Sequence, residues 1–318
     1  MLLCFFAKPC LADESASSTA YAVLTVEVAN NTANGTAVEN DVVIVQIYKE
    51  GQLLQTLDSK VGADGRAVFK NVPAGEQIVA VARARHQNMM FSGQRVALKP
   101  AGGKLSAYVR VFDVTDDKSR LSIGTHHFIM RAHSESLEIT EYMQLNNSSD
   151  MAVSSGEKDS EHRTIVLEIM LPKGFKNLRP SGYLEEGALV VTEEGFYDTM
   201  AVAPGDYQVA FSYTLDITSN TMDIVKRFSF PTSSFIVFAE LGRAKLQGLG
   251  QVENQFVRTN GPPMEYYKRS NLAPAEEITF QITGFNVNTS DLSMWLILLV
   301  VFSAVVALAI LRLRGEKN

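Results

Sequence analysis

The stretch YQVAFSY, residues 207–213, places a large apolar or aromatic side chain at every second position. This period of two is typical of a strand with one face in a core and the other toward solvent. The same alternation occurs far away in the sequence, at Leu24, Val26 and Val28 and again at Ile278, Phe280 and Ile282. The sequence therefore predicts half-buried β-strands, and no comparable helical stripe precedes residue 292.

Further short runs extend this pattern along the chain. They are rich in β-branched and aromatic residues, are bounded by Gly, Pro, Asn and Asp, and cover residues 42–48, 78–82, 105–112, 164–170 and 235–239. Many short strands without intervening helices predict an all-β chain of tandem antiparallel β-sandwiches. We expect the first sandwich at residues 21–114 and a second β-rich domain at residues 121–285, with either a small juxtamembrane module or an extended stalk from about residue 241.

The middle of the first predicted sandwich carries a recognisable motif. Residues 62–75, GADGRAVFKNVPAG, are followed by the strand-like QIVAV at 77–81. Before them, a predicted strand at residues 42–48 leads into a turn at Glu50-Gly51-Gln52. This pattern resembles the carboxypeptidase regulatory-like domain, a transthyretin-like sandwich of seven strands. The resemblance covers about a third of the chain and implies a fold and an accessory role beside another unit. It carries no catalytic residue onto this sequence.

Near the C-terminus stand twenty uncharged and mostly apolar residues, LSMWLILLVVFSAVVALAIL, which begin at Leu292 and end at Leu311. At about 1.5 Å per residue, a helix of this length spans roughly 30 Å, the thickness of the bilayer's hydrocarbon core. Trp295 suits the outer headgroup region, and Arg312 and Arg314 favour the cytoplasmic side. We therefore expect one transmembrane helix at residues 292–311, a cytoplasmic tail at 312–318 and a type I topology with an extracytoplasmic ectodomain. A buried core helix, which is seldom apolar on every side, is the alternative.

Residues 1–12, MLLCFFAKPCLA, combine a short apolar run with small residues at its end. They predict a secretory signal peptide, which lacks the usual positive n-region and would then be truncated. A lipoprotein signal with the lipid on Cys10 is the alternative, although Lys8 and Pro9 fit a lipobox poorly. Cys4 and Cys10 are the only cysteines, so a processed chain would contain no disulfide and no thiol chemistry.

The charged and histidine residues point away from catalysis. A net charge of −6 and the lack of a basic cluster disfavour nucleic acid as a partner. His126 and His127 are adjacent in a predicted strand, so they should face opposite sides of a sheet, and with His133 they do not form a convincing metal site. No GxSxG, HExxH, Walker or dinucleotide motif occurs. We expect no catalytic residue, no metal and no cofactor.

Two short segments are candidates for a partner surface, because Met and aromatic residues adapt well at interfaces. The first is Met89, Met90 and Phe91, and the second is Met264, Tyr266 and Tyr267 after Pro262 and Pro263. Ordinary core packing is the alternative for about half of these residues. Only their burial separates the two interpretations.

Two hypotheses for function follow from this organisation. In the first, the protein is a non-catalytic, membrane-anchored accessory or scaffold subunit of an assembly in or at the membrane. In the second, it is a surface module or sensor that binds a carbohydrate, peptide or small molecule at its loops. We favour the first, because a tail of seven residues carries no signalling domain.

Overall fold

A computed structural model describes residues 20–99, 104–240, 245–257 and 263–285. Within these ranges the chain is nearly all β, as predicted, and its helical turns are the three-residue 3₁₀ segments η1 (Lys118–Arg120) and η2 (Glu186–Ala188). No helix in the described part is long and apolar enough to cross a membrane. The predicted signal at 1–12, transmembrane helix at 292–311 and tail at 312–318 lie outside the described residues.

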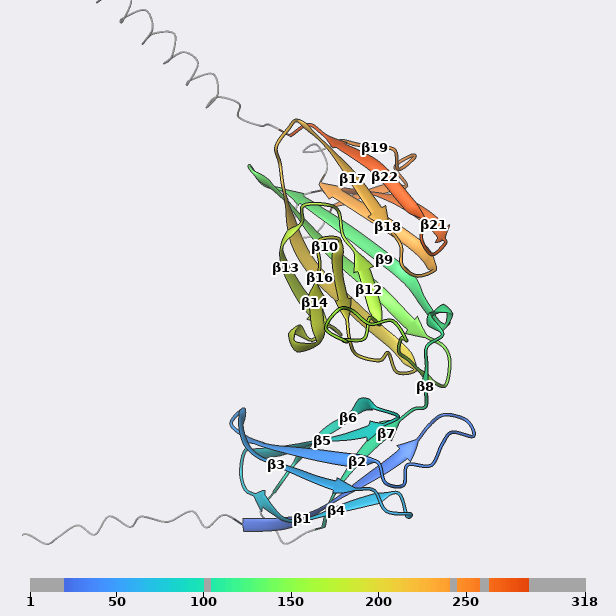
Figure 1. The fold of residues 1–318 in the computed structure, drawn as a ribbon. Helices are drawn as coiled ribbons and strands as arrows, with labels where there is room; N and C mark the ends of the chain where they lie inside the picture. Colours follow the sequence, from blue (N-terminus) through green and yellow to red (C-terminus); the bar gives the residue numbers. More distant parts are fainter. Residues whose placement is uncertain (1–19, 100–103, 241–244, 258–262, 286–318) are drawn as a thin grey trace, which may run out of the picture. The chain divides into compact units, whose positions relative to one another are not determined.

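The chain forms two compact units (Figure 1). The N-terminal unit extends to Thr115 and includes Asp150–Ala152, and the C-terminal unit comprises Asp116–Ser149 and the chain from Val153 onward. The strands of the N-terminal unit are β1 (Ala20–Asn30), β2 (Val42–Lys49), β3 (Gln52–Lys60), β4 (Arg66–Ala74), β5 (Ile78–His86), β6 (Met89–Ala97), β7 (Lys104–Val111) and the two-residue β8 (Val114–Thr115).

Two sheets build the N-terminal unit, with strand orders β4-β1-β7 and β3-β2-β5-β6. Alternate residues of each strand are buried, as the period of two predicts: Leu24 and Val26 of β1 and Val45 and Ile47 of β2 are completely inaccessible. Gly65 has a φ of 76° in the turn before β4, a conformation that favours glycine. The core of this unit is therefore made by the inward faces of its strands.

One short strand, β11 (Ala152–Val153), spans the boundary between the units. The C-terminal unit contains the other strands: β9 (Leu121–Ala132), β10 (Ser136–Asn147), β12 (Leu167–Met170), β13 (Lys176–Gly182), β14 (Leu189–Val191), β15 (Gly195–Asp198), β16 (Gly205–Asp216), β17 (Thr221–Arg227), β18 (Thr232–Glu240), β19 (Lys245–Gln247), β20 (Asn254–Val257), β21 (Pro263–Leu272) and β22 (Glu277–Thr283). A seven-stranded sheet has the order β13-β16-β10-β9-β18-β21-β20, and two three-stranded sheets have the orders β12-β15-β14 and β17-β22-β19.

Both small sheets pack on one face of the large sheet and share one core with it. Phe196 of β15 meets Phe211 of β16 with 5.0 Å between ring centroids, and Phe280 of β22 meets Phe128 of β9 at 5.9 Å. The layer that covers the large sheet is thus divided between two sheets. β12 and β17 are the edge strands at which the two small sheets face each other.

The prediction of purely antiparallel sheets is wrong in two places. β1 pairs with β7 in parallel, and β9 pairs with β18 in parallel. Parallel neighbours need a long connection rather than a hairpin, and in each case the chain builds several other strands before it returns. Alternation in a single strand carries no information about the direction of its neighbour, so the sequence pattern could not reveal these pairs.

Two local irregularities position the groups described below. The register between β9 and β10 shifts near Gly124, so that Met143 lies opposite His126 while Leu145 lies opposite Ile123. This shift turns His126 toward the core. Gly195, with a φ of 152°, brings β15 so close to β12 that a Cβ would lie 2.0 Å from the Ile169 carbonyl oxygen. Only glycine permits that approach.

Candidate functional site

A buried carboxylate, Glu141 of β10, organises the most polar part of the C-terminal core. Its Oε2 accepts a hydrogen bond from His126 Nε2 at 2.6 Å, and its Oε1 accepts one from the Tyr213 hydroxyl at 2.7 Å. Lys226 Nζ lies 2.7 Å from Oε2 and 3.0 Å from Oε1. All four residues are at most 2% exposed. We call these four residues the Glu141 network.

The ionisation states in this network follow from its contacts. Burial alone would raise the pKa of Glu141, but the charge of Lys226 and the hydrogen bond from His126 outweigh it and hold the pKa at about 2. Burial lowers the pKa of His126 despite the nearby carboxylate, and it raises the pKa of Tyr213. Glu141 and Lys226 are therefore an ion pair, and the neutral imidazole and phenol each donate a hydrogen bond to the carboxylate.

The position of Lys226 follows from the alternation of β17. Ile224 and Lys226 point into the core, whereas Asp223, Val225 and Arg227 point outward. A lysine at an inward position needs an acceptor, because an unpaired buried ammonium group is very costly. Lys226 has two: the Glu141 carboxylate and the main-chain oxygen of Met170, at 3.0 Å. It thereby connects the large sheet, β17 and β12.

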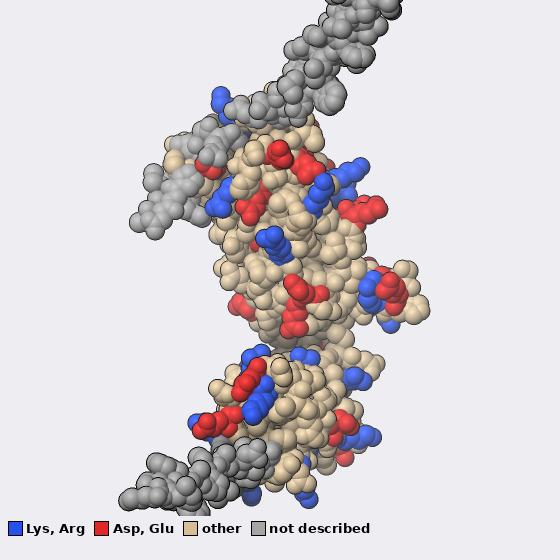
Figure 2. Space-filling view, turned by 90° about the vertical axis from the view of Figure 1, so that its left-hand side faces the viewer, with Lys and Arg blue, Asp and Glu red and all other residues tan. Residues whose placement is uncertain are grey.

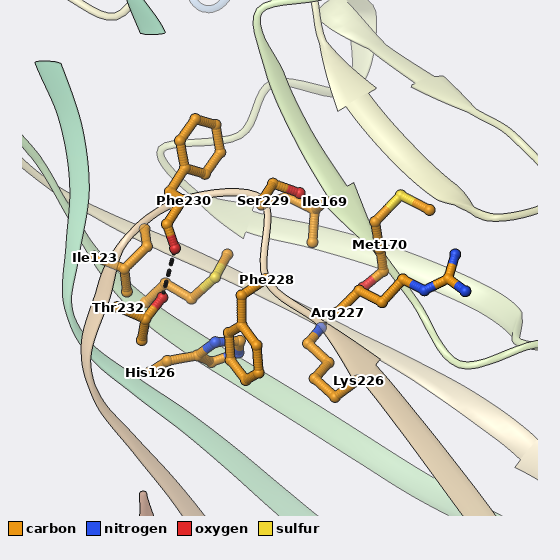
Figure 3. Close-up of a pocket in the computed structure, with 11 residues that line it drawn as sticks. Ile123, His126, Ile169, Met170, Lys226, Arg227, Phe228, Ser229, Phe230 and Thr232 are labelled. Atoms are coloured by element: carbon orange, nitrogen blue, oxygen red, sulfur yellow. Dashed lines mark hydrogen bonds between the residues drawn. The ribbon is translucent and has the colours of Figure 1, made fainter. Parts of the chain in front are cut away.

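Above the network lies a small cavity of about 20 Å³ (Figure 3). Its lining combines Ile123 and Met143 of the large sheet, Ile169 and Met170 of β12 and the loop from Arg227 to Thr232. Thr232 Oγ1 donates to the Phe230 main-chain oxygen at 3.0 Å and so closes this loop. Phe228 lies edge-on to the His126 ring, with 6.0 Å between centroids. The cavity can hold a water molecule or a methyl-sized group.

Two open hollows continue from the cavity toward the surface, and both are lined by Met170 and Arg227. The first, of about 810 Å³, is bordered by Glu168, Phe230, Pro231, Pro274 and the ion pairs Lys118–Glu157 and Arg227–Glu277. The second, of about 430 Å³, is lined by Met170, Leu171, Lys173, Glu193, Glu194, Val225 and Arg227. We call the two hollows together the β12 groove. Its size is that of a ligand or peptide site.

The groove offers surface for binding and few reacting groups. The network below it is enclosed and internally satisfied, and Lys118 and Arg227 at the rim are paired with carboxylates at 2.7 and 2.8 Å. Within the described residues, no group of three or more His, Cys, Asp or Glu is arranged to hold a metal ion. The groove is therefore suited to binding an extended, partly apolar ligand between its charged margins.

The six described residues of the predicted partner surface divide by burial. Phe91, Met264 and Tyr267 are between 5% and 7% exposed and pack inward, where the Tyr267 hydroxyl donates to Glu265 at 3.0 Å. These three are core residues and are not available as contact surface. Met90 is 39% exposed, and Met89 and Tyr266 are half-buried, the latter with its ring 5.8 Å from that of Phe238.

The two predicted segments belong to different units of the chain. Met89–Ala97 forms β6 in the N-terminal unit, whereas Met264, Tyr266 and Tyr267 belong to β21 in the C-terminal unit. The predicted membrane-anchor residues Trp295, Arg312 and Arg314 lie outside the described residues. His126 and His127 face opposite sides of β9, and His133 is exposed beside Glu138.

A second buried histidine, His86, lies at the end of β5 in the N-terminal unit. Its Nδ1 is 2.6 Å from Asp41 Oδ2 and its Nε2 is 2.9 Å from Asp113 Oδ1. Thr36 and Asn30 also donate to Asp113, at 2.8 and 2.7 Å. Burial opposes ionisation of Asp113, but the hydrogen bonds from His86 and Thr36 lower its pKa to about 2. These contacts hold the long loop before β2, residues 31–41, against the end of β5.

Sequence reasoning missed Glu141, Lys226 and Tyr213, although two of them left a signal. Glu141 stands between Ile139 and Met143 at an inward position of an alternating strand, and Lys226 follows Ile224 in the same way. A charged residue in the apolar register of two separate strands suggests that the two pair in the core. The assignment of these two as partners required the fold, because 85 residues separate them.

Charges of both signs are interspersed on the face shown in Figure 2. In sequence, however, the two units differ: residues 20–115 contain 10 Lys and Arg against 8 Asp and Glu, and residues 116–149 and 153–285 contain 15 against 22. The acidity of the chain therefore resides in the C-terminal unit, which carries the β12 groove. A basic partner would be attracted to this unit.

Comparison with known proteins gives little to set beside this geometry. No protein family model and no curated protein matches the chain. Among solved structures, an M1 zinc metallopeptidase from Deinococcus radiodurans bound to a Tyr-Ser-Ala substrate is 11% identical with a TM-score of 0.31, and a two-domain M1 zinc metallopeptidase bound to L-tryptophan is 12% identical with a TM-score of 0.33. In both cases 51% of this chain and 42% of the other are covered, so this chain matches less than half the length of those structures. Similarity at this level identifies neither a family nor an activity.

Proposed function

We propose that the protein is a non-catalytic, membrane-anchored accessory or scaffold subunit of a membrane-associated assembly. Its two β units are tandem β-sandwiches on the extracytoplasmic side, and a transmembrane helix at residues 292–311 holds them at the bilayer. The partner is a protein in or at the same membrane, and the subunit contributes binding surface rather than chemistry.

One observation carries this proposal: the most polar groups of the C-terminal unit satisfy one another. Glu141 takes hydrogen bonds from His126, Tyr213 and Lys226, and all of these groups are buried. A general base or nucleophile must reach the substrate within hydrogen-bond distance. The groove above the network instead presents Met, Phe and Pro side chains between charged margins, which is the composition of a contact surface.

The N-terminal unit supports the same role. Seven strands, β1 to β7, form its two sheets, which agrees with the resemblance of residues 62–81 to the seven-stranded carboxypeptidase regulatory-like domain. Such domains commonly accompany a catalytic or membrane unit. The buried His86 cluster stabilises a loop end and, like the Glu141 network, consists of groups bonded to one another.

The test is to purify the full chain gently from its native membrane through a tag at the C-terminus and to determine the mass and composition of the purified complex. A protein partner in stoichiometric amount is the expected result. A second preparation, with a stop codon at position 292, should release a folded ectodomain that no longer supports the assembly. A lone monomer or homo-oligomer from the native membrane would overturn the accessory role.

The second hypothesis, a ligand-binding module or sensor, is favoured by the volume of the β12 groove. A hollow of about 810 Å³ lies within the range of sites for small molecules and cofactors. If the chain is purified alone, binding of carbohydrates, peptides or small molecules at this groove becomes the function to test.

A further inference from the structure

The β12 groove runs along a strand edge that has hydrogen-bonding capacity. β12 pairs with β15 on one side, and no described strand pairs with its other side. Leu171 N, just after β12, donates to Glu194 O, and the Ile169 oxygen lies against Gly195 of β15, so the main-chain groups of these two residues point toward β15. Because successive main-chain groups of a strand point to opposite sides, the N–H groups of Glu168 and Met170 point away from β15, toward the groove, as does the Met170 oxygen that accepts from Lys226.

A second strand edge faces the groove from the other side. β17 pairs with β22, and no described strand pairs with its remaining edge. Val225 and Arg227 of β17 line the same hollow as Met170 and Leu171. The connection between the edges is the side chain of Lys226, which spans the space to the Met170 oxygen, rather than a main-chain hydrogen bond. The two small sheets are therefore separated where one further strand would make them continuous.

Such an arrangement selects an extended polypeptide over other ligands. Main-chain N–H and C=O groups at a sheet edge bind an added strand through its backbone, and pockets beside the edge select alternate side chains. The lining of the groove follows β12 and the residues after it, from Glu168 to Lys173, so it is long enough for an extended segment. A flat small molecule would leave these main-chain groups without acceptors and donors.

The side chains of the groove specify the added strand. The cavity of about 20 Å³ below Met170 has room for a small apolar group, so the inward residue of the strand is of Ala to Val size. At the end of the groove near Lys173, Glu193 and Glu194 add two carboxylates. A basic residue on the bound segment complements them, and it also complements the excess of acidic residues in this unit.

We propose that the free edge of β12 binds an extended segment of a partner protein as an added strand between β12 and β17. The segment places a small apolar side chain over the cavity and a Lys or Arg beside Glu193 and Glu194. This inference rests on the proposed accessory function, because it specifies how that subunit holds its partner. The recognition is through the backbone of the segment, with the side chains setting the register.

The test uses random heptapeptides displayed on phage and selected against the full chain in detergent. We expect the selected peptides to carry a small apolar residue and a basic residue, and to bind as synthetic peptides. Two N-methylated versions of a selected peptide are then compared, one methylated at the odd-numbered and one at the even-numbered backbone nitrogens. One version should bind at least about tenfold more weakly and the other almost as well as the unmodified peptide, because only one side of an added strand faces β12. Equal binding by all methylated peptides would overturn strand addition.

Matched variants locate the binding. Val225→Trp should block the groove, whereas Val252→Trp should not, since Val252 is equally exposed at 39% but does not line the groove. The charge reversal E193K/E194K should weaken a basic peptide about tenfold or more, and E185K/E186K should leave it unchanged. Binding that ignores Val225→Trp, or a selection without any enriched peptide, overturns this inference. Neither result alters the composition of the complex purified from native membranes, so failure here is distinguishable from failure of the accessory role.

Discussion

His86 and His126 are both 2% exposed and both hydrogen-bonded to carboxylates, yet the charged groups around the two rings differ. His86 lies between Asp41 and Asp113, with one ring nitrogen toward each, so the ring is the partner that both carboxylates share. His126 meets one carboxylate, Glu141, which already has Lys226 as its counter-charge. A buried histidine can thus bridge two carboxylates in one unit and share a single carboxylate with a lysine in the other.

This difference predicts which of the two clusters costs more stability when it is broken. In the N-terminal unit, the carboxylates near His86 are 13% to 15% exposed, so water partly solvates their charge. In the C-terminal unit, Glu141 and Lys226 are at most 1% exposed, and neither can turn to water if the other is removed. The Glu141 network should therefore be the more costly cluster to break.

The largest effect expected is from Glu141→Ala. This variant leaves the Lys226 ammonium buried without its carboxylate, which should lower the free energy of unfolding by about 3–5 kcal/mol. Denaturant unfolding of the full chain, followed by a probe in the C-terminal unit, measures it. The double variant E141L/K226M is the control: it removes both charges and should recover most of the loss. A cost below about 1 kcal/mol for Glu141→Ala would contradict the ion pair.

His86→Ala should be the next largest, at about 2–3 kcal/mol, because two carboxylates lose their hydrogen-bond donor in a part-buried site. The loss should appear in the unfolding of the N-terminal unit and in faster hydrogen exchange of the Thr36 amide, which donates to Asp113. His86→Asn keeps some donor capacity and should cost less. Equal unfolding of the wild type and His86→Ala would contradict the role of the ring as the shared partner.

Sequence reasoning was sufficient for the all-β class, because that class depends on local alternation such as that of Tyr207 to Tyr213. It failed where two distant strands meet. The parallel pairs β1/β7 and β9/β18 depend on which strand returns to which, and a period of two is the same in either direction. Of the six residues in the predicted partner surface, Phe91, Met264 and Tyr267 are buried, and the sequence could not separate them from the others because aromatic and Met residues suit cores and interfaces equally.

The candidate site was still harder to predict. Glu141 and Lys226 each break the apolar register of a strand, which marks them as unusual, but nothing in the sequence states that β10 and β17 face each other across a core. The β12 groove depends on a missing neighbour at a strand edge, which is a property of sheet order rather than of any residue. A sequence records what a strand contains and leaves unspecified which of its edges is paired.

Asp198 is a buried carboxylate that forms no ion pair with a described residue, and it extends the comparison to a third kind of site. Asp198 is 0% exposed, its Oδ1 accepts from Met200 N at 2.8 Å, and its Oδ2 has no hydrogen-bond partner among the described residues. Burial raises its pKa to about 6. Because the folded-state pKa lies above the unfolded value, the stability from this proton is complete below about pH 4 and is lost as the pH rises through 6.

Asp198→Asn should therefore stabilise the C-terminal unit, by about 1–2 kcal/mol at pH 7.5, and should have little effect or a small cost at pH 4. The gain is smaller than the full pKa change implies, since the amide nitrogen takes over the place of the unsatisfied oxygen. Thermal unfolding at the two pH values measures the difference. Destabilisation at pH 7.5 would indicate that an ordered water or another donor satisfies Oδ2, and that the carboxylate is held in its charged form.

The smallest effect is expected for His133→Ala, and it isolates burial as the cause of the others. His133 Nε2 lies 3.3 Å from Glu138 Oε2, so it too is a histidine beside a carboxylate, but its side chain is 50% exposed. An exposed pair gains little because water solvates both partners equally well when they separate. We expect a change within about 0.5 kcal/mol in the unfolding of the C-terminal unit. If His133→Ala cost as much as His86→Ala, the contact itself and not its burial would set the energy, and the contrast between the two cores would lose its physical basis.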